Sequence, residues 1–102
     1  MNDAVQTLIE GGVATLLLNR PDKLNALDAD MARALNTATR ALAENVEVRC
    51  VVVSGAGDHF QAGGDIEYFR AGLAGDEAAR RTEIRAIIQE VHAAITHLRT
   101  MP

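Results

Sequence analysis

A glycine-rich segment, residues 55–65, could bring main-chain amides close to a bound ligand. It reads Gly-Ala-Gly-Asp-His-Phe-Gln-Ala-Gly-Gly-Asp and follows an apolar run at 50–53. Glycine lets a backbone approach a ligand closely, although glycines also occur in flexible surface connections. The amides near Gly64 and Asp65 are expected at a helix start, where unsatisfied N–H groups attract negative charge. Such amides can form an oxyanion hole, in which one donor contributes roughly 3 to 4 kcal/mol to transition-state stabilisation.

Two phosphate-binding motifs share features with this segment but do not match it. Gly55-Ala56-Gly57 begins like the dinucleotide fingerprint GxGxxG, yet Phe60 stands where its third glycine is required. No Gly-Lys-Ser or Gly-Lys-Thr follows, as a P-loop would need. A small nucleotide-binding domain that binds NAD is therefore the weakest of the functional hypotheses.

The histidines and Asp65 are expected to be solvated or structural rather than catalytic. His59 is expected to be solvated, and His92 and His97 are five residues apart, which places them on different helix faces rather than at metal-ligand spacing. We predict no metal site and expect both of these histidines at the surface. Asp65 is expected to accept backbone N–H bonds and to fix the loop.

A basic cluster formed by Arg80, Arg81 and Arg85 is interpreted as a solvated helix face, because Glu77 and Glu83 lie nearby in the sequence. Surface arginines with such neighbours need no ligand to explain them. The cluster is therefore not predicted to be a binding site.

The bulk properties exclude several classes of protein. The chain has 102 residues, enough for one domain, and a net charge of −4, which disfavours nucleic-acid binding. Cys50 is the only cysteine and lies in an apolar run, so we expect a buried thiol in a reducing compartment. No apolar run approaches membrane-spanning length and no secretory signal is evident. We predict a cytoplasmic protein without membrane partners.

The first elements that must position the glycine-rich segment are two strands. The runs 4–9 and 13–18 are separated by Glu10, Gly11 and Gly12, and a Gly-Gly pair favours a tight hairpin turn. Pro21 then ends regular structure, because proline has no amide hydrogen for a sheet. We predict a β-hairpin followed by a loop at 19–22.

A helix, a strand and two further helices are predicted next. Asp28 is the expected N-cap of a helix whose apolar stripe is Met31, Leu35, Ala38 and Leu42. The β-branched run 48–53 is typical of a strand buried on both faces. A short helix is expected from Asp65 or Ile66, interrupted at Gly72 and Gly75. A longer one, capped by Asp76, should pack one face against a core through Ile84, Ile87, Ile88, Val91, Ile95 and Leu98.

Two segments together resemble the crotonase (enoyl-CoA hydratase/isomerase) family. Gly55, Gly57, Phe60, Ala62, Gly63 and Asp65 are similar to the family's oxyanion-loop motif, Gly-x-Gly-x-x-Phe-x-Ala-Gly-x-Asp. About forty residues upstream, Asn19-Arg20-Pro21-Asp22-Lys23-Leu24-Asn25-Ala26-Leu27 is similar to the family's coenzyme A loop. The resemblance covers essentially the whole chain and implies an α/β fold, with residues 1–102 forming the N-terminal part of a crotonase-like spiral of ββα units.

The resemblance also implies a site. The backbone N–H of Gly64 would be the first oxyanion donor, holding the carbonyl oxygen of an acyl-CoA thioester. Lys23, Leu24 and Ala26 would lie near the CoA moiety, and Lys23 could pair with a CoA phosphate or remain solvated. The adenine and pantetheine path would run along Ala62, Gly63, Gly64, Asp65, Ile66 and Glu67, while Tyr68 and Glu67 could border the acyl pocket or be exposed.

The expected activity is enolate stabilisation, for hydration of a 2-enoyl-CoA or for double-bond isomerisation in fatty acid metabolism. The family is more than twice this length, and its second oxyanion amide and the two glutamates of hydratases correspond to positions after residue 102. The alternative is an incomplete fragment that keeps only CoA binding or assembly. The family implies no permanent cofactor, coenzyme A being part of the substrate, and a homo-oligomer, trimeric or hexameric.

Overall fold

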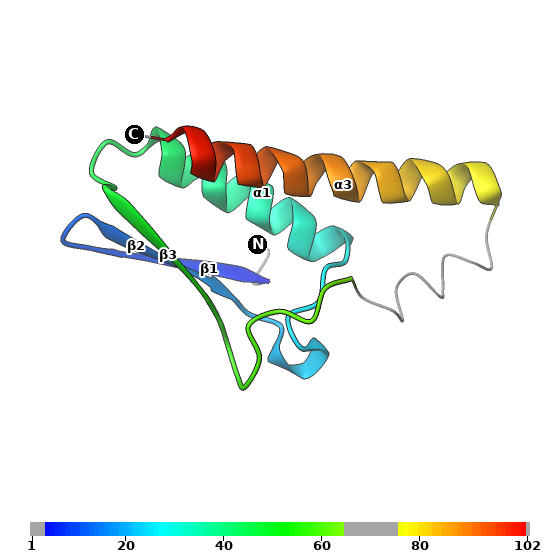
Figure 1. Cartoon of the computed structure of the whole chain (residues 1–102), viewed down its shortest axis with the longest axis horizontal. Coiled ribbons are helices and arrows are strands. Elements are labelled where there is room, and N and C mark those ends of the chain that lie inside the picture. Colours follow the sequence, from blue (N-terminus) through cyan, green and yellow to red (C-terminus); the bar gives the residue numbers. More distant parts are fainter. Residues whose placement is uncertain (1–3, 65–75, 102) are drawn as a thin grey trace.

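The protein forms a three-stranded sheet with two long helices on one side of it (Figure 1). The computed structural model describes residues 4–64 and 76–101. The predicted α/β class is confirmed. The strands are β1 (Val5–Glu10), β2 (Val13–Leu18) and β3 (Cys50–Gly55), and the helices are the 3-10 helix η1 (Pro21–Lys23), α1 (Ala29–Glu44) and α3 (Glu77–Thr100).

The predicted hairpin is confirmed as the antiparallel pair of β1 and β2. Glu10 pairs with Val13, so the connection consists of Gly11 and Gly12 alone. Their φ angles are +57° and +83°, which glycine adopts without the steric cost that a Cβ would impose.

The order of the strands, β1-β2-β3, places β2 at the centre of the sheet. β2 and β3 are parallel, with Val13 opposite Cys50 and Leu18 opposite Gly55. Parallel strands need a crossover between them, and α1 provides it. Because their carboxyl ends meet at one edge of the sheet, the two motif segments leave the sheet side by side.

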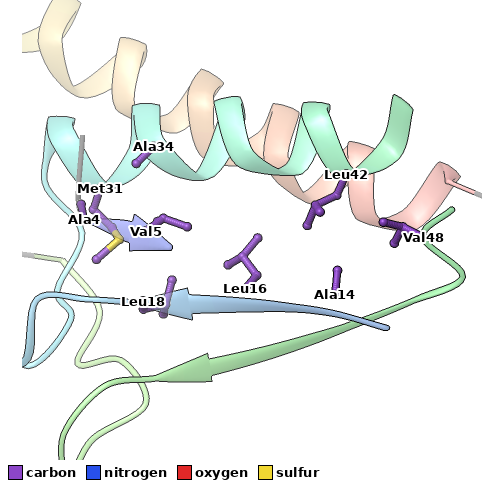
Figure 2. Close-up of a cluster of buried hydrophobic side chains, with 9 residues drawn as sticks. All are labelled: Ala4, Val5, Ala14, Leu16, Leu18, Met31, Ala34, Leu42 and Val48. Carbon is purple, nitrogen blue, oxygen red and sulfur yellow. The ribbon is translucent and has the colours of Figure 1, made fainter. Parts of the chain in front are cut away.

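The core lies between the sheet and α1, as Figure 2 shows. The side chain of Asp28 accepts a hydrogen bond from the N–H of Met31 at 2.9 Å, which confirms the predicted N-cap. Met31 and Leu42 are buried, and Leu35 and Ala38 pack against the same cluster. The buried cluster consists of Ala4, Val5, Ala14, Leu16, Leu18, Met31, Ala34, Leu42 and Val48.

The expectation that residues 48–53 are buried on both faces is wrong for this chain. Cys50, predicted to be buried, is exposed, and Val52 is 47% exposed. The reason is position: β3 is the last strand in the sheet order and, within residues 4–64 and 76–101, it pairs only with β2. A hollow of about 290 Å³ lies beside it, lined by Arg49, Cys50, Val51, Val53, Leu98 and Met101.

Helix α3 packs against α1 through a narrower face than its sequence predicted. Asp76 is its N-cap, as expected, with its carboxylate accepting from the N–H of Ala78 at 3.2 Å. Ile87 and Ala94 are buried. The expected broad apolar face is partly wrong, because one helix as a neighbour covers a single stripe and leaves another in solvent. The exposed stripe is Ile84, Ile88 and Ile95.

The basic cluster on α3 is exposed at two of its three positions, as predicted, whereas Arg80 is partly buried. Arg81 and Arg85 are exposed, and Arg81 pairs with Glu77 at 2.8 Å with both side chains in solvent. The short helix predicted from Asp65 or Ile66, with its interruptions at Gly72 and Gly75, lies outside the described residues.

Candidate functional site

Two loops at the carboxyl ends of β2 and β3 form the candidate site. We call residues 20–27 the Lys23 loop and residues 55–64 the glycine loop. Figure 1 shows them side by side below the sheet. Ligands of sheets with parallel strands commonly bind outside the carboxyl ends of those strands. The structure therefore brings together the two segments that the sequence singled out.

Main-chain hydrogen bonds join the two loops directly. The N–H of Ala62 donates to the carbonyl of Leu24 at 3.0 Å, and the N–H of Leu27 donates to the carbonyl of Gly63 at 2.6 Å. Leu27 and Gly64 form a parallel β-bridge. The end of the glycine loop is thus held as a short strand-like extension against the end of the Lys23 loop.

The peptide group between Gly63 and Gly64 has a defined direction. Its carbonyl oxygen accepts from Leu27, and the peptide bonds of the described residues are all trans. In a planar trans peptide the N–H points opposite the C=O. The N–H of Gly64 therefore points away from Leu27, and it donates to no acceptor among residues 4–64 and 76–101.

The side chain of Asn25 forms hydrogen bonds to both loops. It is fully buried, and its Oδ1 accepts from the N–H of Arg20 at 2.7 Å. Its Nδ2 donates to the carbonyl of Ala56 at 3.0 Å and to that of His59 at 2.9 Å. One amide group therefore closes the Lys23 loop and holds the first half of the glycine loop.

The backbone of the Lys23 loop makes this contact through two consecutive left-handed residues. Leu24 has a φ of +55° and Asn25 a φ of +56°. Their amides close the turn by donating to the carbonyls of Pro21 at 3.2 Å and Arg20 at 2.8 Å, respectively. Asparagine tolerates this conformation, whereas a leucine there is strained.

Glycine is required at three positions of the glycine loop for different structural reasons. A Cβ on Gly57 would lie 2.9 Å from the Cβ of Pro21, so the loops touch there, and its φ is +81°. Gly63 has a φ of +96° with open space around it, so its conformation rather than its size requires glycine. A Cβ on Gly55 would collide with the carbonyl of Phe60, because the loop folds back on itself.

The predicted site residues divide between surface and interior. Lys23 and Leu24 are exposed, as are Ala62 and Gly64, while Gly63 is half-buried. Ala26 is buried, only 8% exposed. The predicted residues Asp65, Ile66 and Glu67, together with Tyr68, lie outside the described residues.

Asn25 belongs to the predicted coenzyme A loop, but no role for its side chain was predicted from the sequence. The sequence feature that could have indicated a role is the backbone conformation that asparagine favours. Asparagine is, after glycine, a residue that often occupies left-handed backbone, and it follows a tight turn begun by Pro21. Its partners are carbonyls in another loop, which no side-chain pattern reveals.

The three histidines lie in different settings, His59 in the glycine loop and His92 and His97 on α3. His59 is exposed, and its main-chain carbonyl makes the contact with Asn25. His92 is exposed as predicted, but His97 is only partly exposed, and its Nδ1 lies 2.9 Å from Oγ1 of the buried Thr39. The surface prediction for His97 is therefore wrong, because α3 turns that side of the ring toward α1.

No cluster of three or more potential metal ligands occurs among the described residues, and the absence of a metal site stays a prediction. In the same part of the chain, none of the helices combines the length and the apolarity that crossing a bilayer would require.

Residues 13–102 match the model of the enoyl-CoA hydratase/isomerase family. A peroxisomal Delta(3,5)-Delta(2,4)-dienoyl-CoA isomerase of Arabidopsis thaliana is 34% identical over 92 residues, 85% of this chain and 33% of that protein. A hydroxycinnamoyl-CoA hydratase-lyase of Pseudomonas fluorescens is 38% identical over 74 residues, 72% of this chain and 27% of that protein.

The fold has solved relatives as well. The crystal structure of an enoyl-CoA hydratase/carnithine racemase from Magnetospirillum magneticum matches with a TM-score of 0.79 and 35% identity, over 98% of this chain and 36% of that one. The chain thus spans about a third of the length of the relatives that it matches. It belongs to the enoyl-CoA hydratase/isomerase family, within the crotonase superfamily, and corresponds to the N-terminal portion of that fold.

Proposed function

We propose that this chain binds an acyl-CoA thioester across its two joined loops, with the N–H of Gly64 donating to the thioester carbonyl oxygen. The direction of the Gly63–Gly64 peptide carries the proposal. The bond from Leu27 to the carbonyl of Gly63 turns the next N–H away from the Lys23 loop. Gly64 is exposed, so a ligand can reach that donor.

A fixed amide donor favours the charge that develops on the carbonyl oxygen. When a proton leaves the α-carbon or a nucleophile adds to the β-carbon, the thioester becomes enolate-like and its oxygen becomes negative. A donor already aimed at that oxygen stabilises it without reorganising. The whole protein would use this for hydration of a 2-enoyl-CoA, a lyase reaction, or for double-bond isomerisation in fatty acid metabolism.

Coenzyme A is assigned to the same pair of loops. Lys23 is exposed at the end of η1, where its ammonium group is free to pair with a phosphate. Leu24 is 44% exposed and offers apolar contact beside it. The pantetheine path along Ala62, Gly63 and Gly64 would continue through Asp65, Ile66 and Glu67. Coenzyme A is then part of the substrate, and no permanent cofactor is required.

The alternative is that these residues retain CoA binding or assembly without turnover. It is favoured by the length of the match, about a third of each relative. The second oxyanion donor and the acid/base glutamates that the family implies fall outside residues 1–102. A homo-oligomer, trimeric or hexameric, and a cytoplasmic location stay predictions.

Two substitutions at one position test the oxyanion donor. Gly64→Pro removes the N–H, whereas Gly64→Ala keeps it. With butyryl-CoA labelled with ¹³C at the carbonyl carbon, we expect the chain to shift the carbonyl resonance downfield, and the shift to vanish with proline but not with alanine. A shift that survives the loss of the N–H contradicts the assignment of Gly64.

Hydration of but-2-enoyl-CoA distinguishes the two functional hypotheses. Turnover by the 102-residue chain that is lost in Gly64→Pro excludes the fragment hypothesis. Binding of butyryl-CoA without turnover supports that hypothesis instead and shows that these residues do not suffice for catalysis.

A further inference from the structure

We propose that Asn25 is a positioning residue that sets the Gly64 donor relative to the coenzyme A loop. The inference rests on the proposed function, since it concerns how that site is held. Asn25 makes no assigned contact with the substrate. It acts through the two loops that its side chain joins.

The hydrogen bonds of Asn25 use both hydrogens of its Nδ2 and also its Oδ1. The Oδ1 is bonded within the Lys23 loop, to Arg20, and the Nδ2 is bonded to Ala56 and His59 in the glycine loop. The residue has no exposed surface. A buried amide that is bonded on both sides cannot rotate without leaving donors or acceptors unpaired, so it holds the loops at a fixed separation.

Few side chains could replace it. An aspartate keeps the acceptor for Arg20 but turns a carboxylate oxygen toward two carbonyl oxygens. The backbone adds a second restriction, because the φ of +56° disfavours most other residues. Asparagine satisfies the polar and the conformational requirement together.

Asn25 influences the direction of the Gly64 N–H through the hydrogen bonds between residues 24–27 and 62–64. The neighbours of Asn25 provide the two main-chain bonds that fix the end of the glycine loop: the carbonyl of Leu24 accepts from Ala62, and the N–H of Leu27 donates to Gly63. Asn25 thus holds the start of the glycine loop with its side chain, while its left-handed backbone directs these flanking groups to the end. The second bond sets the direction of the Gly64 N–H.

The test compares Asn25→Asp with Asn36→Asp as a matched control. Asn36 is a half-buried asparagine on α1, outside both loops, whose Nδ2 donates to Glu90 at 2.6 Å. Asn25→Ser, whose one hydroxyl can donate to only one carbonyl, provides a milder change. Two readouts are measured on each chain: amide hydrogen exchange of Leu27 and Ala62, and the ¹³C carbonyl shift of bound butyryl-CoA.

We expect Asn25→Asp to raise the exchange rates of the Leu27 and Ala62 amides by at least about tenfold relative to amides of β2. The carbonyl shift should fall by more than half, with an intermediate loss in Asn25→Ser. Asn36→Asp should leave both readouts near those of the wild-type chain, even where it lowers the midpoint of unfolding.

The other outcomes overturn the inference in distinguishable ways. A wild-type carbonyl shift that persists in Asn25→Asp overturns the positioning role and leaves the proposed function standing. A wild-type chain that binds butyryl-CoA without any shift, or does not bind it, overturns the proposed function and the positioning role with it. Loss of folding in both Asn25 variants, but not in Asn36→Asp, overturns positioning in favour of global stability.

Discussion

The side-chain amide of Asn25 donates to the main-chain carbonyl of His59, 34 residues away in the sequence, at a distance of 2.9 Å. This bond joins the loop after β2 to the loop after β3. It places a buried polar group at the carboxyl edge of a small sheet, where the candidate site lies. Two further hydrogen bonds between the loops, from Ala62 to Leu24 and from Leu27 to Gly63, join backbone atoms.

Gly57→Ala should destabilise the protein by about 2–4 kcal/mol, because it adds left-handed strain and a collision with Pro21. Gly11→Ala is the control, since its φ is +57° but nothing lies within 4 Å of an added Cβ. We expect a cost of about 1 kcal/mol there. Urea unfolding of both variants measures the difference. Equal costs would show that the loops do not touch at Gly57.

Leu24→Gly should stabilise the chain by up to about 1 kcal/mol. Glycine removes the strain of a φ of +55°, which exceeds the entropy that glycine costs in the unfolded chain. Leu24→Ala keeps the strain and removes the same exposed side chain. A gain in unfolding free energy that appears with alanine as well would have to come from the side chain rather than the backbone.

Lys23→Gln should weaken coenzyme A binding roughly 3- to 10-fold at low ionic strength, with the difference shrinking as salt is added. Arg40→Gln removes an exposed positive charge from α1 and is the control. Titration calorimetry at two salt concentrations provides the measurement. Equal losses in both variants would mean that net charge, and not a phosphate contact, is responsible.

Asp28→Ala should cost about 1–2 kcal/mol, because it removes the cap of the helix that carries the core. Asp76→Ala is expected to cost about 0.5 kcal/mol, since its exposed bond to Ala78 is longer, at 3.2 Å. Thermal unfolding of both variants tests this order. A reversed order would indicate that α3 contributes more to the cooperative unit than α1 does.

The contact between Thr39 and His97 should carry a coupling energy of about 0.5–1.5 kcal/mol. The Thr39 hydroxyl donates to the carbonyl of Leu35 at 2.7 Å, so its oxygen can accept a hydrogen bond from His97 in the tautomer that carries the hydrogen on Nδ1. A double-mutant cycle with Thr39→Val and His97→Ala measures the coupling. Strictly additive costs would show that the two side chains contribute independently to holding α3 on α1.

Features determined by residues close together in the chain were predictable from the sequence. The Gly11–Gly12 turn and the Asp28 cap are local, since every group that determines them lies within three residues. Family resemblance identified the two loops that meet at the sheet edge. The same loops contain most of the candidate site.

Features that depend on distant backbone were not predictable. The partners of the Asn25 amide are carbonyls of Ala56 and His59, and carbonyls exist at every position, so side-chain types give no sign of them. The solvent exposure of apolar side chains was not predictable for a related reason. Cys50 and Ile88 have the composition of core residues, but burial requires a covering neighbour, and a sequence pattern does not show where a sheet or a helix pair ends.

The main-chain bonds between the loops have an evolutionary consequence. The links from Ala62 to Leu24 and from Leu27 to Gly63 join backbone atoms at both ends. Side chains at the exposed positions Leu24 and Ala62 can therefore change by mutation without breaking the bonds that fix the Gly64 N–H. Under the proposed function, related proteins with this arrangement can change their contacts with coenzyme A at these two positions while the direction of the Gly64 N–H stays the same.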